Sequence, residues 1–136
     1  MNNLGQILDF PLFGAENGSL SVLKGNGGFE VLPFDIKRVL LMKDMNNRAV
    51  RGGHTHHKTR QVLFVVSGSC KVDLDNGKEK SSVILNKFNQ GLLLEPYVWH
   101  VMKDFENNTV LLVLADSEYD EKDYIRNYDE FLKLVK

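Results

Sequence analysis

The amino-acid sequence predicts an all-β fold, a sandwich or a barrel, followed by a C-terminal α-helix. Short apolar and β-branched runs recur from about position 34 to position 115, and turn residues separate them. Short strands at even spacing with tight turns favour a sandwich or barrel over alternating strands and helices. Residues 120–136 change to a helical spacing of apolar side chains. The length of 136 residues fits a single domain spanning residues 1–136.

The first predicted elements are a turn and a strand. The stretch KGNGGFE at 24–30 is rich in Gly and Asn and predicts a turn. FDIKRVLLM at 34–42 is the first strong strand. The apolar run at 62–66 ends at Ser-Gly-Ser, and residues 70–75 alternate apolar and polar side chains as a half-buried strand does. Residues 61–85 are therefore expected to hold several strands.

A hairpin, further strands and the helix complete the prediction. Asp-Asn-Gly at 75–77 predicts a hairpin turn, because Asn and Gly tolerate positive φ. Further strands are expected within 80–85, 90–96, 98–105 and 108–115. In the tail, Asp120 and Glu121 suit the start of a helix, and Lys133 and Lys136 suit its end. We expect this helix to pack on the flank of the barrel.

Composition and charge exclude several classes of function. The net charge of −1 gives no general attraction to nucleic acid or to an anionic membrane. No apolar run approaches the roughly 20 residues of a membrane span, and the N-terminus has no secretory signal. The single cysteine, Cys70, cannot form an internal disulfide. These features predict a cytoplasmic enzyme or binding protein with neither nucleic-acid nor membrane partners.

Three histidines within four positions are the candidate functional site. His54 and His56 should share one face of a strand, and His57 should point to the other. Histidine titrates near neutrality, so this pair could transfer protons. It could also bind a metal, or be merely polar. Gln61 weakens the metal alternative, because a neutral amide is a poorer ligand than a carboxylate for a divalent cation.

The spacing around these histidines resembles the first cupin motif. His-x-His is followed after four residues by Gln61, where cupins carry glutamate, and after six more by Gly68. Pro96 and His100 resemble the second cupin motif. The resemblance implies a small jelly-roll barrel with three inward histidines.

The wider sequence resembles a narrower family, the WxcM-like or FdtA/QdtA nucleotide-sugar 3,4-ketoisomerases. The matching segments are PFDIKRV (33–39), RGGHTHHKTRQVL (51–63), GLLLEPYVWH (91–100) and LVLADSEYDEKDYIRNYDEF (112–131). The family acts on thymidine-diphosphate-linked 4-keto-6-deoxy-glucose and uses no metal or other cofactor. Its members form homodimers, often by exchanging N-terminal strands. The resemblance therefore implies the same substrate and a homodimer for this chain.

The resemblance also implies roles for particular residues. The His-x-His pair, His54 and His56, would move a proton from C3 to C4 of the sugar through an enediol. Arg51 would stabilise the enediolate or bind the diphosphate. Arg38 and Gln61 are candidate ligand contacts, and Trp99 offers a flat face near the pocket. These last three residues could equally be structural: a strand-edge ion pair, a hydrogen-bonding scaffold and a core side chain.

The sequence departs from the family pattern at several positions. Leu40 stands where the family has a tyrosine that lines the active site. His100 resembles the type that inverts C4 and gives the galacto product. In the family, a second residue near the N-terminus also distinguishes the two product stereochemistries. Asn17 aligns with that residue and matches the residue type of neither group. His57 stands where lysine is common.

Three hypotheses follow from these features. The first is a metal-free 3,4-ketoisomerase, supported by Arg51, His54 and His56. The second is a metal-dependent cupin enzyme, against which Gln61 counts. The third is a non-catalytic module that binds a nucleotide sugar, which the loss of tyrosine at Leu40 would allow.

Overall fold

The computed structural model describes residues 4–14, 16–24 and 32–136. Apart from Lys24, the turn expected at 24–30 lies outside these residues. The elements are β1 (Gln6–Asp9), β2 (Leu12–Phe13), β3 (Leu20–Ser21), β4 (Arg38–Met45), β5 (Arg51–His56), β6 (Gln61–Ser67), β7 (Cys70–Asp75), β8 (Lys80–Leu85), β9 (Gln90–Leu94), β10 (Trp99–Lys103), β11 (Thr109–Ala115), a 3₁₀ turn (Glu121–Asp123), β12 (Tyr124–Ile125) and α1 (Tyr128–Leu134).

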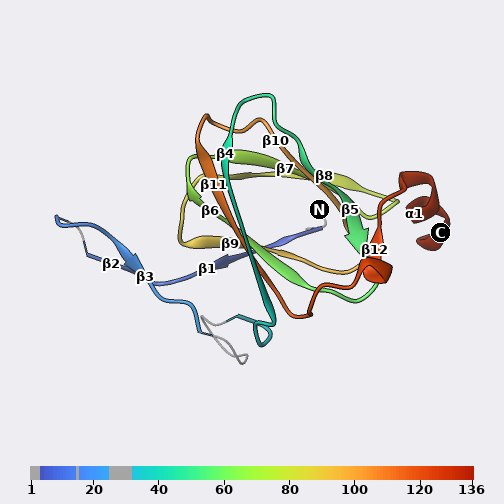
Figure 1. Cartoon of the computed structure of the whole chain (residues 1–136), viewed down its shortest axis with the longest axis horizontal. Coiled ribbons are helices and arrows are strands. Elements are labelled where there is room, and N and C mark those ends of the chain that lie inside the picture. Colours follow the sequence, from blue (N-terminus) through green and yellow to red (C-terminus); the bar gives the residue numbers. More distant parts are fainter. Residues whose placement is uncertain (1–3, 15, 25–31) are drawn as a thin grey trace.

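Two antiparallel sheets form the body of the molecule (Figure 1). One has the strand order β1-β9-β6-β11-β4, and the other has the order β12-β5-β10-β7-β8. They close over a shared core of buried side chains such as Leu63, Val65, Val72, Leu92 and Leu111. The predicted all-β jelly-roll barrel with a C-terminal helix is confirmed.

Strand β6 is apolar from Val62 to Val65 because both of its faces are covered there. Leu63 and Val65 point into the barrel. Val62 and Phe64 point outward into a second buried cluster with Phe34 from the segment before β4. This two-sided burial explains why residues 62–65 show no alternation between apolar and polar side chains.

The β7–β8 hairpin follows the predicted pattern with one difference. Cys70, Val72 and Leu74 face the core, and Gly77 has φ +91° in the turn. Asp75, expected on the polar face, is buried because α1 covers it. Its carboxylate accepts hydrogen bonds from the Gly77 N–H (2.7 Å) and the Tyr128 hydroxyl (2.6 Å).

The predicted C-terminal helix is shorter than its sequence pattern suggested. Asn127 caps α1 by accepting a hydrogen bond from the Glu130 N–H, and Phe131 is buried. Upstream, Tyr124 and Ile125 form β12, which pairs with the edge of β5. The helical prediction was wrong for these two residues, because a local pattern cannot register a distant strand edge that offers backbone partners.

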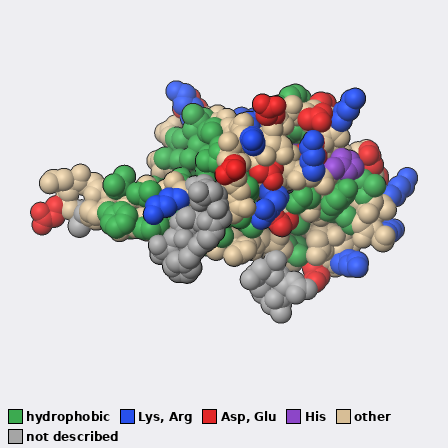
Figure 2. All heavy atoms as spheres, turned by 90° about the horizontal axis from the view of Figure 1, so that it is seen from below, with side chains coloured by type: hydrophobic (Ala, Val, Ile, Leu, Met, Phe, Trp, Pro, Cys, Tyr) green, Lys and Arg blue, Asp and Glu red, His purple; other side chains and the backbone are tan. Residues whose placement is uncertain are grey.

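A short arm projects from the barrel at the end opposite to α1 (Figure 1). It consists of the paired strands β2 and β3. Leu12, Phe13 and Leu20 on this arm are more than half exposed, and Figure 2 shows the apolar side chains gathered there. No described helix has the length and apolar character required to cross a membrane.

Candidate active site

A cavity of about 570 Å³ opens into the barrel between the two sheets. Its polar lining is Arg51, His54, Gln61, His100, Tyr124 and Arg126. Its apolar lining includes Leu40, Met42, Leu63, Leu94, Met102 and Val113. One wall is therefore rich in imidazole, phenol and guanidinium groups, and the rest is hydrocarbon.

Strand pairing brings four rings together at the polar wall. His54 lies opposite His100 on β10, and His56 lies opposite Tyr124 on β12. The ring of His54 is 4.9 Å from that of His100, 5.1 Å from that of Tyr124 and 5.2 Å from that of His56. Since directly paired residues share a face of a sheet, the β5 register alone assembles this cluster.

Glycine at position 52 allows the close approach of β5 and β10. Gly52 has φ +84°, and a Cβ atom built there would lie 2.8 Å from the carbonyl oxygen of His100. Both the conformation and the space exclude an ordinary side chain. The Gly52 position therefore belongs to the architecture that sets His54 against His100.

The two histidines of the His-x-His pair differ in their access to the cavity. His54 lines the cavity, whereas His56 is only 2% exposed and is not among the lining residues. The Nε2 atom of His56 is buried without a hydrogen-bond partner among the described residues. The ring of His56 packs 4.6 Å from that of Tyr124.

Burial keeps these imidazoles neutral. Burial, followed by the nearby charges of His56 and Arg126, lowers the pKa of His54 from 6.5 to about 4. Burial and then His100 lower the pKa of His56 to about 4. Burial and then His54 lower the pKa of His100 to about 3. At pH 7 His54 therefore presents an unprotonated nitrogen, as a general base requires.

The orientation of His100 is fixed by a backbone contact. Its Nδ1 atom lies 3.1 Å from the carbonyl oxygen of Val98. A carbonyl only accepts, so Nδ1 carries the proton in the neutral ring. The Nε2 atom of His100 is then a hydrogen-bond acceptor.

Arginines surround the polar wall. Arg51 and Arg126 line the cavity, and Glu121 holds Arg126 through two hydrogen bonds of 2.9 and 3.0 Å. Arg38, partly buried and outside the set of lining residues, donates from Nη1 to the Tyr124 hydroxyl at 3.5 Å. The contact of Arg38 with a ligand stays a prediction.

A buried carboxylate anchors the turn that follows His56. Asp123 accepts hydrogen bonds from the Lys58 N–H at 2.8 Å and from the Thr59 hydroxyl. Burial raises the pKa of Asp123, but these hydrogen bonds and the proximity of His56 lower it below its usual range. The 3₁₀ turn is thereby joined to the end of β5.

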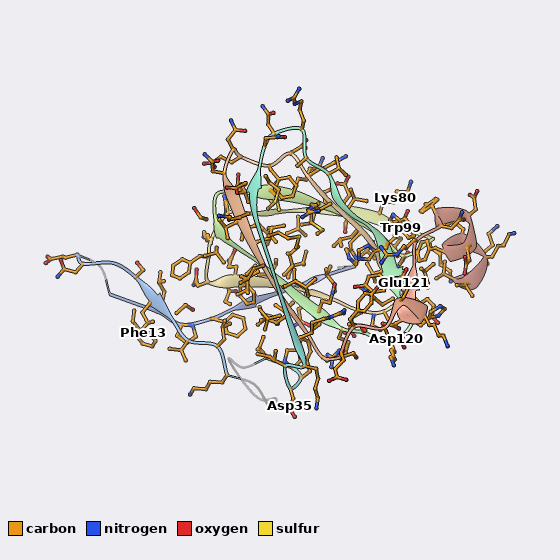
Figure 3. All side chains as sticks on the ribbon, in the orientation of Figure 1. Phe13, Asp35, Lys80, Trp99, Asp120 and Glu121 are labelled. Atoms are coloured by element: carbon orange, nitrogen blue, oxygen red, sulfur yellow. The ribbon has the colours of Figure 1, made fainter. Side chains whose placement is uncertain are left out.

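Other predicted site residues fall inside and outside the cavity. Gln61 lines the cavity, as expected from its position in the cupin motif. Leu40 also lines it, as expected because the family has a tyrosine of the active site at this position. Trp99 points away from it, because His100 and Met102 take the inward positions on β10. The Trp99 ring packs against Phe131 (5.5 Å) and Tyr128 (5.3 Å) of α1, and Figure 3 shows it beside that helix. The expectation that Trp99 lies near this cavity was wrong. Its side chain is only partly buried, outside the core clusters, and lines a second cavity with Asp75 and Tyr128.

Asn17 lies on the projecting arm, outside the cavity of its own chain. Figure 3 shows Phe13 of the same arm standing clear of the barrel. Within a single chain, Asn17 therefore cannot contact a ligand held against His54.

The donor set does not form a metal centre within the described ranges. No group of three or more His, Cys, Asp or Glu side chains is arranged there to hold an ion. Gln61 brings a neutral amide to the position where the cupin motif has a carboxylate.

Sequence reasoning missed Tyr124 and Arg126 as lining residues. Both lie in the segment that was interpreted as a helix with an inward apolar stripe. The signal that could have revealed them is the β-branched Ile125 between two large side chains, which suits a short edge strand.

Comparison with known proteins agrees with the geometry. The chain matches the family model FdtA, described as WxcM-like, C-terminal, over residues 3–136. It is 40% identical over 130 residues to the TDP-4-oxo-6-deoxy-alpha-D-glucose-3,4-oxoisomerase of Aneurinibacillus thermoaerophilus, and the match covers 96% of this chain and 91% of that protein.

Solved structures give the same result. A 3,4-ketoisomerase from Helicobacter canadensis is similar with a TM-score of 0.90 and 39% identity, over 96% of each chain. A mutant of the 3,4-ketoisomerase QdtA from Thermoanaerobacterium thermosaccharolyticum, in complex with TDP-4-keto-6-deoxyglucose, is similar with a TM-score of 0.91 and 37% identity, over 99% of this chain and 96% of that chain. The chain therefore belongs to the FdtA family of WxcM-like proteins.

Proposed function

We propose that this chain is a metal-free isomerase that moves the ketone of thymidine-diphosphate-linked 4-keto-6-deoxy-glucose from C4 to C3. The observation that carries the proposal is the neutral imidazole of His54 at the wall of a cavity that arginines flank. The cavity is large enough for a hexose and part of its diphosphate. Membership of the family supplies the substrate class.

The reaction needs one proton to leave C3 and one to arrive at C4. The C3 proton is acidic because the C4 ketone stabilises the resulting carbanion as an enediolate. His54 takes this proton, the C4 oxygen is protonated, the C3 hydroxyl loses its proton, and C4 receives a proton. The C3 ketone results, with no change in overall composition.

His56 is the second proton-handling group of this wall. Its ring lies 5.2 Å from that of His54, and its Nε2 atom is without a partner among the described residues. A low pKa makes the imidazolium of either residue a strong acid, so a proton taken up in the reaction is readily returned.

The arginines meet the negative charge of the substrate. Arg51 and Arg126 line the cavity on the side of the histidines. Guanidinium groups match the geometry of phosphate oxygens and also stabilise an oxyanion. We assign Arg51 to the enediolate or the diphosphate, and Gln61 to a polar contact with the sugar.

The product is assigned the galacto configuration at C4. His100 lies against His54 at 4.9 Å and is held in one orientation by Val98. Histidine at position 100 resembles the members of the family that invert C4. Because His100 lies beside the base His54, it can influence which face of the sugar receives the proton at C4.

The active form is a homodimer in the cytoplasm. Exposed Leu12, Phe13 and Leu20 give the arm an apolar surface that a second copy would cover (Figure 2). Asn17 on that arm then reaches the cavity of the partner, which accounts for its place outside the cavity of its own chain.

Incubation of chelator-treated protein with thymidine-diphosphate 4-keto-6-deoxy-glucose, followed by proton NMR, tests the assignment. The 3-keto sugar should appear with wild-type protein and be nearly absent with His54→Asn. The control His57→Asn changes an exposed histidine that directly follows β5 and should retain turnover. Activity that requires added metal would favour a metal-dependent cupin, and thymidine diphosphate binding without turnover would favour a binding module.

A further inference from the structure

Tyr124 presents a phenol to the cavity from the edge of the second sheet. It lies opposite His56 in the β12–β5 pairing, so its side chain shares the inward face of His54 and His56. It lines the cavity beside His54, with the two rings 5.1 Å apart. The roles given above to the histidines and Arg51 leave this phenol unused.

The Tyr124 hydroxyl accepts a hydrogen bond but donates none to a described residue. Its oxygen accepts a hydrogen bond from Arg38 Nη1 at 3.5 Å. No described residue accepts the phenolic proton. A phenol has one proton to donate as well as lone pairs to accept with, so this proton is available to a molecule in the cavity.

Arg38 makes the phenol a stronger donor. Its Nε atom is buried without a partner, and none of the ion pairs within the described part of the chain includes it. Its guanidinium lies between the Tyr124 hydroxyl and the ring of Tyr119, and no ion pair among the described residues offsets its charge. A cation that donates to the phenol oxygen draws electron density from the O–H bond and strengthens the hydrogen bond that the proton can make.

The ring is held in place on several sides. The guanidinium of Arg126 lies over it, 4.2 Å from its centroid, and Glu121 fixes that guanidinium in turn. The rings of His54 and His56 contact it edge-on. Such a donor needs little reorganisation when charge develops nearby, which is the property required for stabilising an oxyanion.

The opposite wall offers no comparable group. Leu40 and Met42 present hydrocarbon there, and among the described residues the amide of Gln61 is its one polar side chain. On the polar wall, the Nδ1 proton of His100 is already donated to Val98. The first charge to develop in the reaction is on the C4 oxygen, as the C3 proton leaves.

We propose that Tyr124 is a further catalytic residue, whose hydroxyl donates a hydrogen bond to the C4 oxygen of the sugar in the enediolate, with Arg38 as its positioning residue. This inference rests on the proposed ketoisomerase function. It assigns the oxyanion stabilisation in part to a side chain outside the His-x-His motif.

The test is Tyr124→Phe, which removes the hydroxyl and keeps the ring. Loss of one oxyanion donor lowers kcat by about 10²–10³-fold in other enzymes. We expect a fall of that order in kcat, with KM and thymidine diphosphate affinity within about threefold of wild type. The matched control is Tyr97→Phe, since among the described residues the Tyr97 hydroxyl bonds only to the ring of exposed His57, and Tyr97 lies outside the cavity lining. It should retain the wild-type kcat.

The outcomes separate the two proposals. If wild-type protein does not convert the substrate, the proposed function fails irrespective of Tyr124. If wild type converts it and Tyr124→Phe does so at an undiminished rate, Tyr124 is only a wall of the cavity. If Tyr124→Phe unfolds, 3-fluorotyrosine inserted at position 124 replaces it. Its more acidic phenol should move the basic limb of the pH–rate profile to lower pH, and an unmoved limb would overturn the inference.

Discussion

Lowering the pH from 6.5 towards 4 should destabilise the fold through the buried histidines. His54, His56 and His100 have lowered pKa values because burial disfavours the charged imidazolium. In the unfolded chain each would titrate near 6.5. Between the two pKa values the unfolded chain binds more protons than the folded one, so stability is complete above pH 6.5 and decreases as the pH falls.

The magnitude for His56 follows from its own shift. The pKa falls from 6.5 to about 4, and the side chain is 2% exposed, so solvent screening is slight. One pKa unit corresponds to about 1.4 kcal/mol. Protonation of His56 in the unfolded state should therefore cost the folded state up to about 3 kcal/mol between pH 6.5 and pH 4.

Urea unfolding of wild type and His56→Gln at a series of pH values measures the contribution of His56 to the pH dependence of stability. The free energy of unfolding of wild type should fall more steeply than that of the variant, by up to about 3 kcal/mol over the window. Carboxylates with lowered pKa values, such as Glu121 at about 2, also reduce stability at low pH, but they are common to both proteins. His57→Gln, at the surface, serves as the control and should follow wild type.

Parallel curves for wild type and His56→Gln would refute the reasoning. They would mean that His56 takes up its proton as easily in the folded state as in the unfolded one. The burial argument for neutral imidazoles at the cavity wall would then be wrong, and so would the view of His54 as a base with a strongly lowered pKa.

Four further predictions concern the cavity and its surroundings. His54→Asn and His56→Asn should each cut turnover severely, by roughly the 10²–10⁴-fold that general acid–base groups supply, with an unchanged circular dichroism spectrum; near-normal rates would remove the proton-transfer assignment. Leu40→Tyr should alter the rate or the ratio of product epimers measured by NMR, since position 40 lines the cavity; an identical profile would separate this position from the substrate. Trp99→Ala should lower stability by about 2–4 kcal/mol in urea unfolding and leave KM unchanged, because its ring packs on α1; a raised KM would place it in the site after all. Treatment with EDTA should leave turnover intact, since Gln61 supplies an amide in place of a carboxylate; loss of activity restored by a divalent cation would contradict this.

The strands were predictable because their signals are local. Alternation at Cys70, Val72 and Leu74 and the Asp-Asn-Gly turn depend on residues adjacent in sequence, and the structure retains both. Alternation along the strand likewise predicted that His54 and His56 share a face, and the resemblance to the cupin motifs predicted that this face points inward.

The remaining features depend on contacts between distant segments. Tyr124 lies in a strand because its backbone pairs with the edge of β5. The sequence pattern within residues 120–136 contains no information about that distant edge. Trp99 was misplaced because its neighbours His100 and Met102 take the inward positions on β10, and its ring packs instead against Phe131 of α1, which is distant in sequence. The exposure of each histidine to the cavity also depends on distant residues. His56 is buried while His54 lines the cavity because of the rings that surround them.

The most direct test of the central claim is isomerisation in heavy water. Chelator-treated protein is incubated with thymidine-diphosphate 4-keto-6-deoxy-glucose, and proton NMR follows C3 and C4. We expect 3-keto signals with deuterium at C4, and coupling constants that report the galacto configuration. An unchanged spectrum, with thymidine diphosphate still bound, would contradict the claim that this cavity transfers protons on that sugar.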